Sequence, residues 1–266
     1  MSHTVARLAA ALAVVAALAA PAAAAWEIAP HRAIYQLDMG SARMGSQVSD
    51  VDGQMLFLWE ESCDGWTVEQ RYRTRYLFAE GGEVDQWMTY ATWESKDGRD
   101  FNFTVRNATG GMTDEEIRGV AEIGGDGTGR VDYRIPESHA EALPSGTLFP
   151  TAHTLRLLQE AEDGGRFFVS YMFDGTEVDG LSEISAVIGD RQPGPKEAEN
   201  ALLSRPFWPV QLAFFSLSEG GSEPDYEMSV TLYDNGVIDS MLIDYGDFTV
   251  RATLAELEAL DRPDCP

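Results

Sequence analysis

Basic residues are scarce in this 266-residue chain, which holds 19 lysines and arginines against 44 aspartates and glutamates. The formal net charge of −25 at pH 7 repels phosphate backbones and anionic lipid headgroups. Nucleic acid and non-specific membrane binding are therefore disfavoured. Solubility alone explains an acidic surface, and the sequence contains no D-x-[DN]-x-[DN]-G calcium loop.

Histidine is also rare, with four in the chain. None is spaced from another as a zinc-binding pair. The sequence lacks a G-x-S-x-G nucleophile motif, a P-loop and a G-x-G-x-x-G dinucleotide fingerprint. His153 follows Ser145 by a short interval, but proximity in sequence does not indicate triad geometry. We therefore expect no catalytic residues, no metal ligands and no cofactor.

Long apolar runs are absent except near the start of the chain, where residues 8–20 follow Arg7 and precede the small residues 21–25. This run is shorter than the roughly 20 residues that a bilayer-spanning helix needs. It predicts a signal peptide over residues 1–25, cleaved between Ala25 and Trp26. We expect an exported protein with no stable membrane span.

Cysteine is limited to Cys63 and Cys265. An even number of cysteines in an exported protein predicts that they form a disulfide bond. Closing a loop of about 200 residues destabilises the unfolded chain by roughly 5 kcal/mol in the chain-entropy model. The bond would join an early turn to the end of the chain, which favours one closed domain over residues 26–266.

Alternation of apolar and polar residues predicts antiparallel strands in both halves of the chain. In residues 66–78, one face carries Trp66, Val68, Tyr72, Tyr76 and Phe78, and the other carries three arginines. Turn signals such as Asp64-Gly65 and Asn235-Gly236 separate the predicted strands. The pattern indicates a mainly β fold, in which an antiparallel sheet curls into a spiral-like or barrel-like shape.

Helical patterns are few. Residues 152–161 predict one central helix, with Thr151 placed to cap its first turn. Residues 254–260 predict a short C-terminal helix. The glycine-rich and polar stretch 110–129 predicts a long loop that contains a short strand or turn.

Two sets of strand residues leave alternatives open. Arg71, Arg73 and Arg75 either pair with carboxylates such as Glu83 and Asp85 on the next strand, or form a site for an anion or a partner protein. A set of aromatic side chains either packs a core or lines a cleft for an apolar ligand. The set comprises Trp59, Trp66, Tyr72, Tyr76, Trp87, Tyr90 and Trp93.

Several short segments, taken together and in order, resemble one known family. They are residues 29–35, 149–154, 173–175, 232–236 and 243–248, followed by the terminal cysteine. In this order they resemble the EipB family of periplasmic cell-envelope integrity proteins, over nearly the whole mature chain. His31 and His153 match motifs of that family, but the resemblance implies no role for them.

The resemblance implies a spiral-like β-sheet in a single periplasmic domain, with a disulfide between Cys63 and Cys265. It also implies a non-enzymatic contribution to Gram-negative envelope integrity and a functional link to an envelope protein with tetratricopeptide repeats. Our first hypothesis is a periplasmic protein that contacts another envelope protein through a sheet face or edge. The second is a carrier or sensor that holds a lipid, a lipoprotein or another apolar ligand within the curl.

Overall fold

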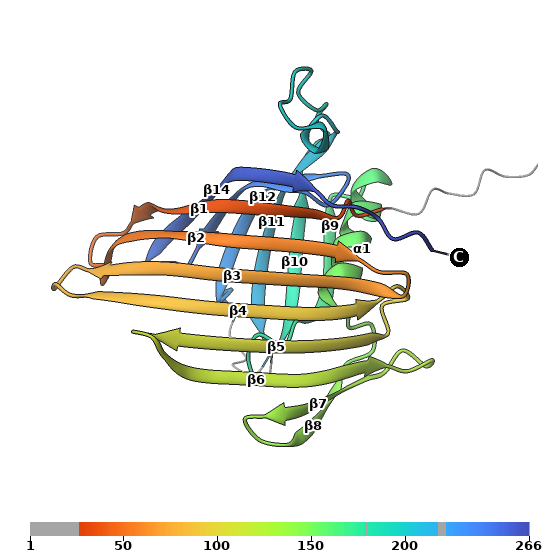
Figure 1. Ribbon diagram of the computed structural model, residues 1–266, viewed down its shortest axis with the longest axis horizontal. Coiled ribbons are helices and arrows are strands. Elements are labelled where there is room, and N and C mark those ends of the chain that lie inside the picture. The colour runs from red at the N-terminus through yellow and green to blue at the C-terminus, as the bar shows by residue number, and fades with distance from the viewer. Residues whose placement is uncertain (1–26, 179, 218–221, 266) are drawn as a thin grey trace, which may run out of the picture.

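The computed structural model describes residues 27–178, 180–217 and 222–265 (Figure 1). The predicted signal peptide and its cleavage point between Ala25 and Trp26 lie outside these residues. The described chain contains one α-helix, α1 (Pro150–Glu162), and one 3-10 turn, η1 (Ala201–Leu203). Its strands are β1 (His31–Ala42), β2 (Val48–Glu61), β3 (Gly65–Phe78), β4 (Glu83–Ser95), β5 (Asp100–Thr109), β6 (Met112–Ile123), β7 (Gly129–Ile135), β8 (His139–Leu143), β9 (Phe167–Phe173), β10 (Leu181–Ile188), β11 (Phe207–Ser216), β12 (Tyr226–Tyr233), β13 (Ile238–Asp244) and β14 (Phe248–Ala259).

These strands form one fourteen-stranded sheet in the order β8-β7-β6-β5-β4-β3-β2-β1-β14-β13-β12-β11-β10-β9. The first and last strands of the described residues, β1 and β14, pair antiparallel in the middle of the sheet. The two edges are β8 and β9, which α1 connects. Figure 1 shows the curl, with β2 to β6 in front and β10 to β12 behind. The predicted mainly β, barrel-like class is confirmed.

Helix α1 packs between the two halves of the curl. Its Leu157 and Leu158 belong to a buried cluster with Trp59 and Trp66 of the front layer and Trp208 of β11. Each fully buried side chain of this kind stabilises the fold by about 1.5–3 kcal/mol. The helix therefore joins β2 and β3 to the back of the sheet at one end of the molecule.

The predicted C-terminal helix over residues 254–260 is wrong, because residues 254–259 are the end of β14. The register of β14 on β1 shifts between Ile34 and Tyr35, whose partners are Glu256 and Leu254. One extra residue in β14 places Leu254 and Leu257 against the same core cluster. A β-bulge thus produced the three-residue apolar spacing that resembled a helix.

The predicted long loop over residues 110–129 is also wrong. Most of it is β6, a twelve-residue strand paired with β5 and β7. Gly119 is an inward position of this strand, where a Cβ atom would lie 2.5 Å from Cζ of Phe103. Close packing against Phe103 requires a glycine at this position. Gly119, a residue type common in turns, therefore lies inside a strand.

Candidate functional site

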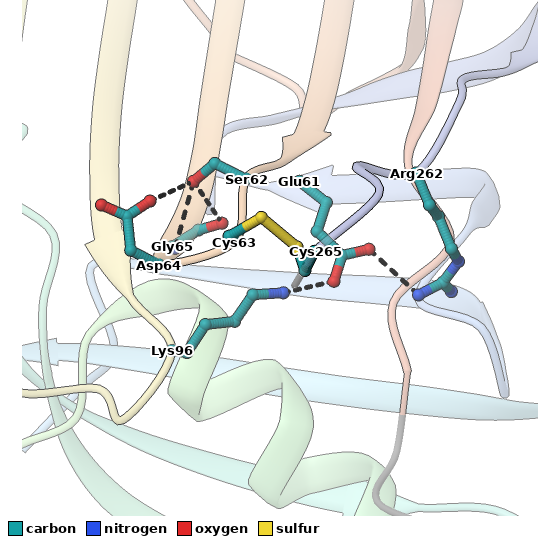
Figure 2. The surroundings of a disulfide bond; sticks show 8 residues. All are labelled: Glu61, Ser62, Cys63, Asp64, Gly65, Lys96, Arg262 and Cys265. Carbon is teal, nitrogen blue, oxygen red and sulfur yellow. Dashed lines mark hydrogen bonds and ion pairs between the residues drawn. A yellow bond between two sulfur atoms is a disulfide. The ribbon is translucent and has the colours of Figure 1, made fainter.

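The disulfide between Cys63 and Cys265 ties the end of the chain to the turn between β2 and β3. The Cα atoms of the two cysteines lie 5.6 Å apart. Figure 2 shows the carboxylate of Glu61 between Lys96 and Arg262, and it pairs with both. The Arg262 Nη1 to Glu61 Oε2 distance is 3.0 Å. Covalent and ionic contacts therefore act on the same C-terminal segment.

The three arginines of β3 lie on the outer face of the sheet, as the alternation predicted. Arg71, Arg73 and Arg75 are exposed, while Trp66 and Val68 are buried on the opposite face. Arg71 pairs with Glu69 of its own strand.

The ion pair of Arg75 crosses to β2, where Nη2 lies 3.6 Å from Oδ1 of Asp52. Among the described residues, Arg75 therefore pairs with β2 rather than with the expected carboxylates of β4. Asp85 lies directly across from Arg75 in the register, and Glu83 lies across from Leu77. The closer carboxylate is Asp52 of β2, the strand on the other side of β3. The sequence pattern of β3 and β4 could not indicate this partner.

Arg73 makes a different contact, since its guanidinium lies 4.7 Å from the ring centre of Trp87. Arg73 and Arg75 line a hollow of about 350 Å³ together with Asp52 and Asp85. Two arginines and two carboxylates leave this hollow without a strong net charge. The geometry favours a polar contact surface over a dedicated anion site.

His31 is buried at the start of β1, with 1% of its surface exposed. Its Nδ1 lies 2.7 Å from the carbonyl oxygen of Ala29, and its ring stacks on Phe57. Burial lowers the pKa of the His31 imidazole. The His31 ring is therefore neutral, packed and bonded to a nearby backbone atom, which indicates a structural role in the core.

His153 is buried in the first turns of α1, where its ring lies 5.5 Å from that of Phe168. Its Nε2 has no hydrogen-bond partner among the described residues. Burial lowers the pKa of His153 to about 4. The folded pKa lies below the unfolded value of 6.5, so charging the ring opposes folding. The stability that the protein has above pH 6.5 is reduced as the pH falls through about 4.

We expect His153→Leu to leave stability at pH 7 unchanged or to raise it by about 1 kcal/mol, because the variant removes a buried polar atom without a partner. The loss of stability between pH 6.5 and pH 4 should also shrink. Urea unfolding of both proteins at pH 7 and pH 5 measures the two effects. Loss of cellular function by a variant of unchanged stability would instead assign His153 an active role.

Glu94 is a buried carboxylate that the sequence analysis did not single out. It is 2% exposed, at an inward position of β4, and accepts hydrogen bonds from the backbone N–H groups of Thr151 and Ala152, both at 2.7 Å. The predicted Thr151 cap is wrong. The residue at the capping position before α1 is Phe149, and its side chain makes no capping hydrogen bond. Glu94 fulfils that role from the sheet.

Burial raises the pKa of Glu94 to about 7, while the two backbone donors act in the opposite direction. The signal in the sequence was the spacing of Tyr90, Thr92 and Glu94, which places a carboxylate on the core-facing side of β4. Glu94 lies among helix backbone groups rather than facing an open cleft. We assign it a structural role in holding α1 inside the curl.

The concave face of the sheet carries tyrosines whose hydroxyl groups bond within the fold. Tyr35 donates to the carbonyl of Ile238 at 2.6 Å, and Tyr90 donates to the carbonyl of Asp174 at 2.7 Å. Tyr72 is inward-facing but only partly buried. Trp59, Trp66 and Tyr90 thus contribute to a packed core, whereas Trp87 is 45% exposed beside Arg73. Part of the concave face remains accessible at Tyr72.

The described ranges of the chain contain no metal-binding cluster and no membrane-spanning helix. No group of three or more histidines, cysteines, aspartates or glutamates there could hold a metal ion. Within the same ranges, no helix has the length and apolar character to cross a membrane.

Comparison with known proteins gives concordant matches along the chain. The chain is 34% identical over 252 residues to the cell envelope integrity protein EipB of Brucella abortus (strain 2308), covering 91% of this chain and 88% of that protein. It also resembles the crystal structure of a β-barrel-like protein from Brucella abortus, with a TM-score of 0.83 and 31% identity, covering 89% of this chain and 100% of that one. The EipB-like family model matches residues 22–261, and the chain therefore belongs to the EipB-like family.

Proposed function

We propose that this chain is a non-catalytic periplasmic protein that supports cell-envelope integrity by binding another envelope protein. The observation that carries this proposal is the similarity to EipB of Brucella abortus, which is named for envelope integrity and aligns with 91% of this chain. The family match over residues 22–261 spans all the described strands and α1, so the proposal concerns the whole domain.

A binding role agrees with the placement of the polar groups. His31 and His153 are buried in packed surroundings, and Glu94 holds a helix end. The exposed arginines of β3 lie on a broad outer face among carboxylates and Trp87, a mixed surface that suits contact with a protein. The partner expected from the family resemblance is an envelope protein with tetratricopeptide repeats.

The periplasm is the proposed compartment. Residues 1–25 have the pattern of a signal peptide, and the disulfide between Cys63 and Cys265 suits an oxidising environment. The acidic composition disfavours nucleic acid as a partner.

Deletion of the gene in its own bacterium should sensitise the cells to detergents that act on the envelope. Re-expression of the full chain should restore resistance, and a form lacking residues 1–25 should fail because it stays in the cytoplasm. Plating on a detergent series measures the effect, with immunoblots to match protein levels. Equal resistance of deletion and parent strains would contradict the proposed function.

A second candidate is a carrier of an apolar or amphipathic ligand inside the curl. It is supported by inward-facing side chains that are only partly buried, namely Tyr72, Tyr76, Met88 and Tyr226. Such a surface suits acyl chains as well as it suits core packing. Native mass spectrometry of protein purified from its own periplasm should show a bound mass if this function applies, and only the bare chain if it does not.

A further inference from the structure

The strand β9 has a free edge at one end of the sheet. Among the described residues, the backbone of β9 pairs with β10 and with the single residue Leu148. The N–H of Ile188 donates to the carbonyl of Arg166 at 2.9 Å, so alternate residues from Arg166 onward bond to β10. Phe167 and Val169 therefore direct their N–H and C=O groups away from the sheet.

Leu148 shows that this edge accepts a strand. Its N–H donates to the carbonyl of Tyr171 at 2.9 Å, and its carbonyl accepts from the N–H of Phe173 at 3.0 Å. The bridge between Leu148 and Met172 is parallel. One residue of the chain's own connection thus occupies the place of a fifteenth strand.

The preceding residues turn away before they can extend this pairing. The N–H of Thr147 donates to the carbonyl of Pro144 at 3.2 Å, and Gly146 has a φ of +86°, which favours glycine. The space beside residues 168–171 is left as a cleft of about 600 Å³, lined by Ser145, Arg156 and Val169 among others. This volume lies in the range of about 300–1,000 Å³ that is typical of ligand sites.

The side chains along the open edge are apolar and exposed. Phe167 is 75% exposed, Val169 57% and Val187 46%, and Phe167 lies across from Val187 on β10. Natural proteins usually protect free edges with charges, prolines or bulges. The outward positions of β9 next to the cleft hold large apolar side chains instead, which an added strand would cover.

We propose that the edge of β9 binds an extended segment of a partner protein by strand addition. Backbone hydrogen bonds to Phe167 and Val169 would supply affinity, and apolar residues at alternate positions of the segment would pack beside these two side chains. The cleft is lined by Glu183 and by Arg156, and Arg156 is paired with Glu160 at 2.6 Å, so a basic residue of the segment would face Glu183. This inference rests on the proposed function and names the surface that performs it.

A second copy of this chain fits the edge less well. Arg156 of α1 and Ser145 of the connecting loop line the cleft opposite β9, so the space suits one strand rather than another sheet. Two chains of net charge −25 also repel each other. The chemistry therefore favours a single basic and apolar segment.

The probe is the capped peptide Lys-Val-Thr-Val-Thr-Val-Lys, titrated into the folded protein labelled with nitrogen-15. We expect shifts of the amide signals of Phe167, Val169 and Tyr171 and a dissociation constant at or below ~1 mM. Val169→Pro removes an outward N–H that β10 does not use, so the sheet should stand while affinity falls about tenfold or more. Val169→Thr keeps the N–H and should bind as the parent does.

Three results would overturn the proposal. They are absent shifts at the β9 edge at millimolar peptide, equal binding by Val169→Pro, and a dimer in sedimentation experiments that Val169→Pro abolishes, which would assign the edge to a second copy. If Val169→Pro unfolds, Phe167→Asp replaces it, since a carboxylate at this exposed position of the same edge should also prevent apolar strand addition. A failure here leaves the detergent phenotype of the deletion strain unaffected, so the two proposals remain separable.

Discussion

Replacement of Cys63 by serine should lower the free energy of unfolding by about 5 kcal/mol, with Cys265 left as a free thiol. The disulfide joins residues that are 202 positions apart, so its loss frees nearly the whole domain to expand in the unfolded state. Urea unfolding monitored by tryptophan fluorescence measures the change, and thiol labelling of the native protein counts the free cysteines.

The double variant Cys63→Ser, Cys265→Ser is the matched control for this experiment. It should lose no more stability than the single variant, because one bond is removed in both cases. A reducing agent should lower the stability of the parent protein by a similar amount and leave the double variant unchanged. Two free thiols in native periplasmic material, or a loss below about 1 kcal/mol, would contradict the structural role of the bond.

Replacement of Glu94 by alanine should lower the free energy of unfolding by about 3 kcal/mol at pH 5, because two buried backbone N–H groups at the start of α1 lose their acceptor. The folded pKa of Glu94, about 7, lies above its ordinary value of 4.5. Its contribution is therefore fully present below pH 4.5 and is lost as the pH rises through about 7.

The difference between parent and Glu94→Ala should accordingly be larger at pH 5 than at pH 8. Urea unfolding at the two pH values tests this, and His153 titrates alike in both proteins, so its effect cancels. Glu83→Ala, which changes an exposed residue of the same strand, should alter stability by about 0.5 kcal/mol or less. A gap that widens toward pH 8 would show that the carboxylate, rather than the neutral acid, stabilises the fold.

Local pattern accounts for the parts of this fold that each strand determines alone. The two faces of β3 follow from alternation, and the Asn235-Gly236 turn follows from its residue types. The end of β14 was mistaken for a helix because a bulge against β1 alters the spacing of Leu254 and Leu257. Such a bulge depends on the pairing of strands that are far apart in sequence.

The candidate sites show the same limit. The outer face of β3 was predicted, but the partner of Arg75 depends on which strands flank it, and Asp52 of β2 is the one reached. Glu94 was missed because one inward carboxylate carries little weight among 44 acidic residues. The open edge of β9 could not be predicted at all, since only the complete strand order shows which strand is last.

The pairing of β1 with β14 has a consequence for how the molecule matures. A chain that emerges from the ribosome with its N-terminus first produces β1 early, yet one side of β1 lacks its partner until the last strand is made. Cys265 follows β14 in the chain, so the covalent closure also waits until the segment after β14 reaches Cys63. Folding that depends on such distant pairings is slow, and truncated products would expose β1 as an edge to neighbouring chains.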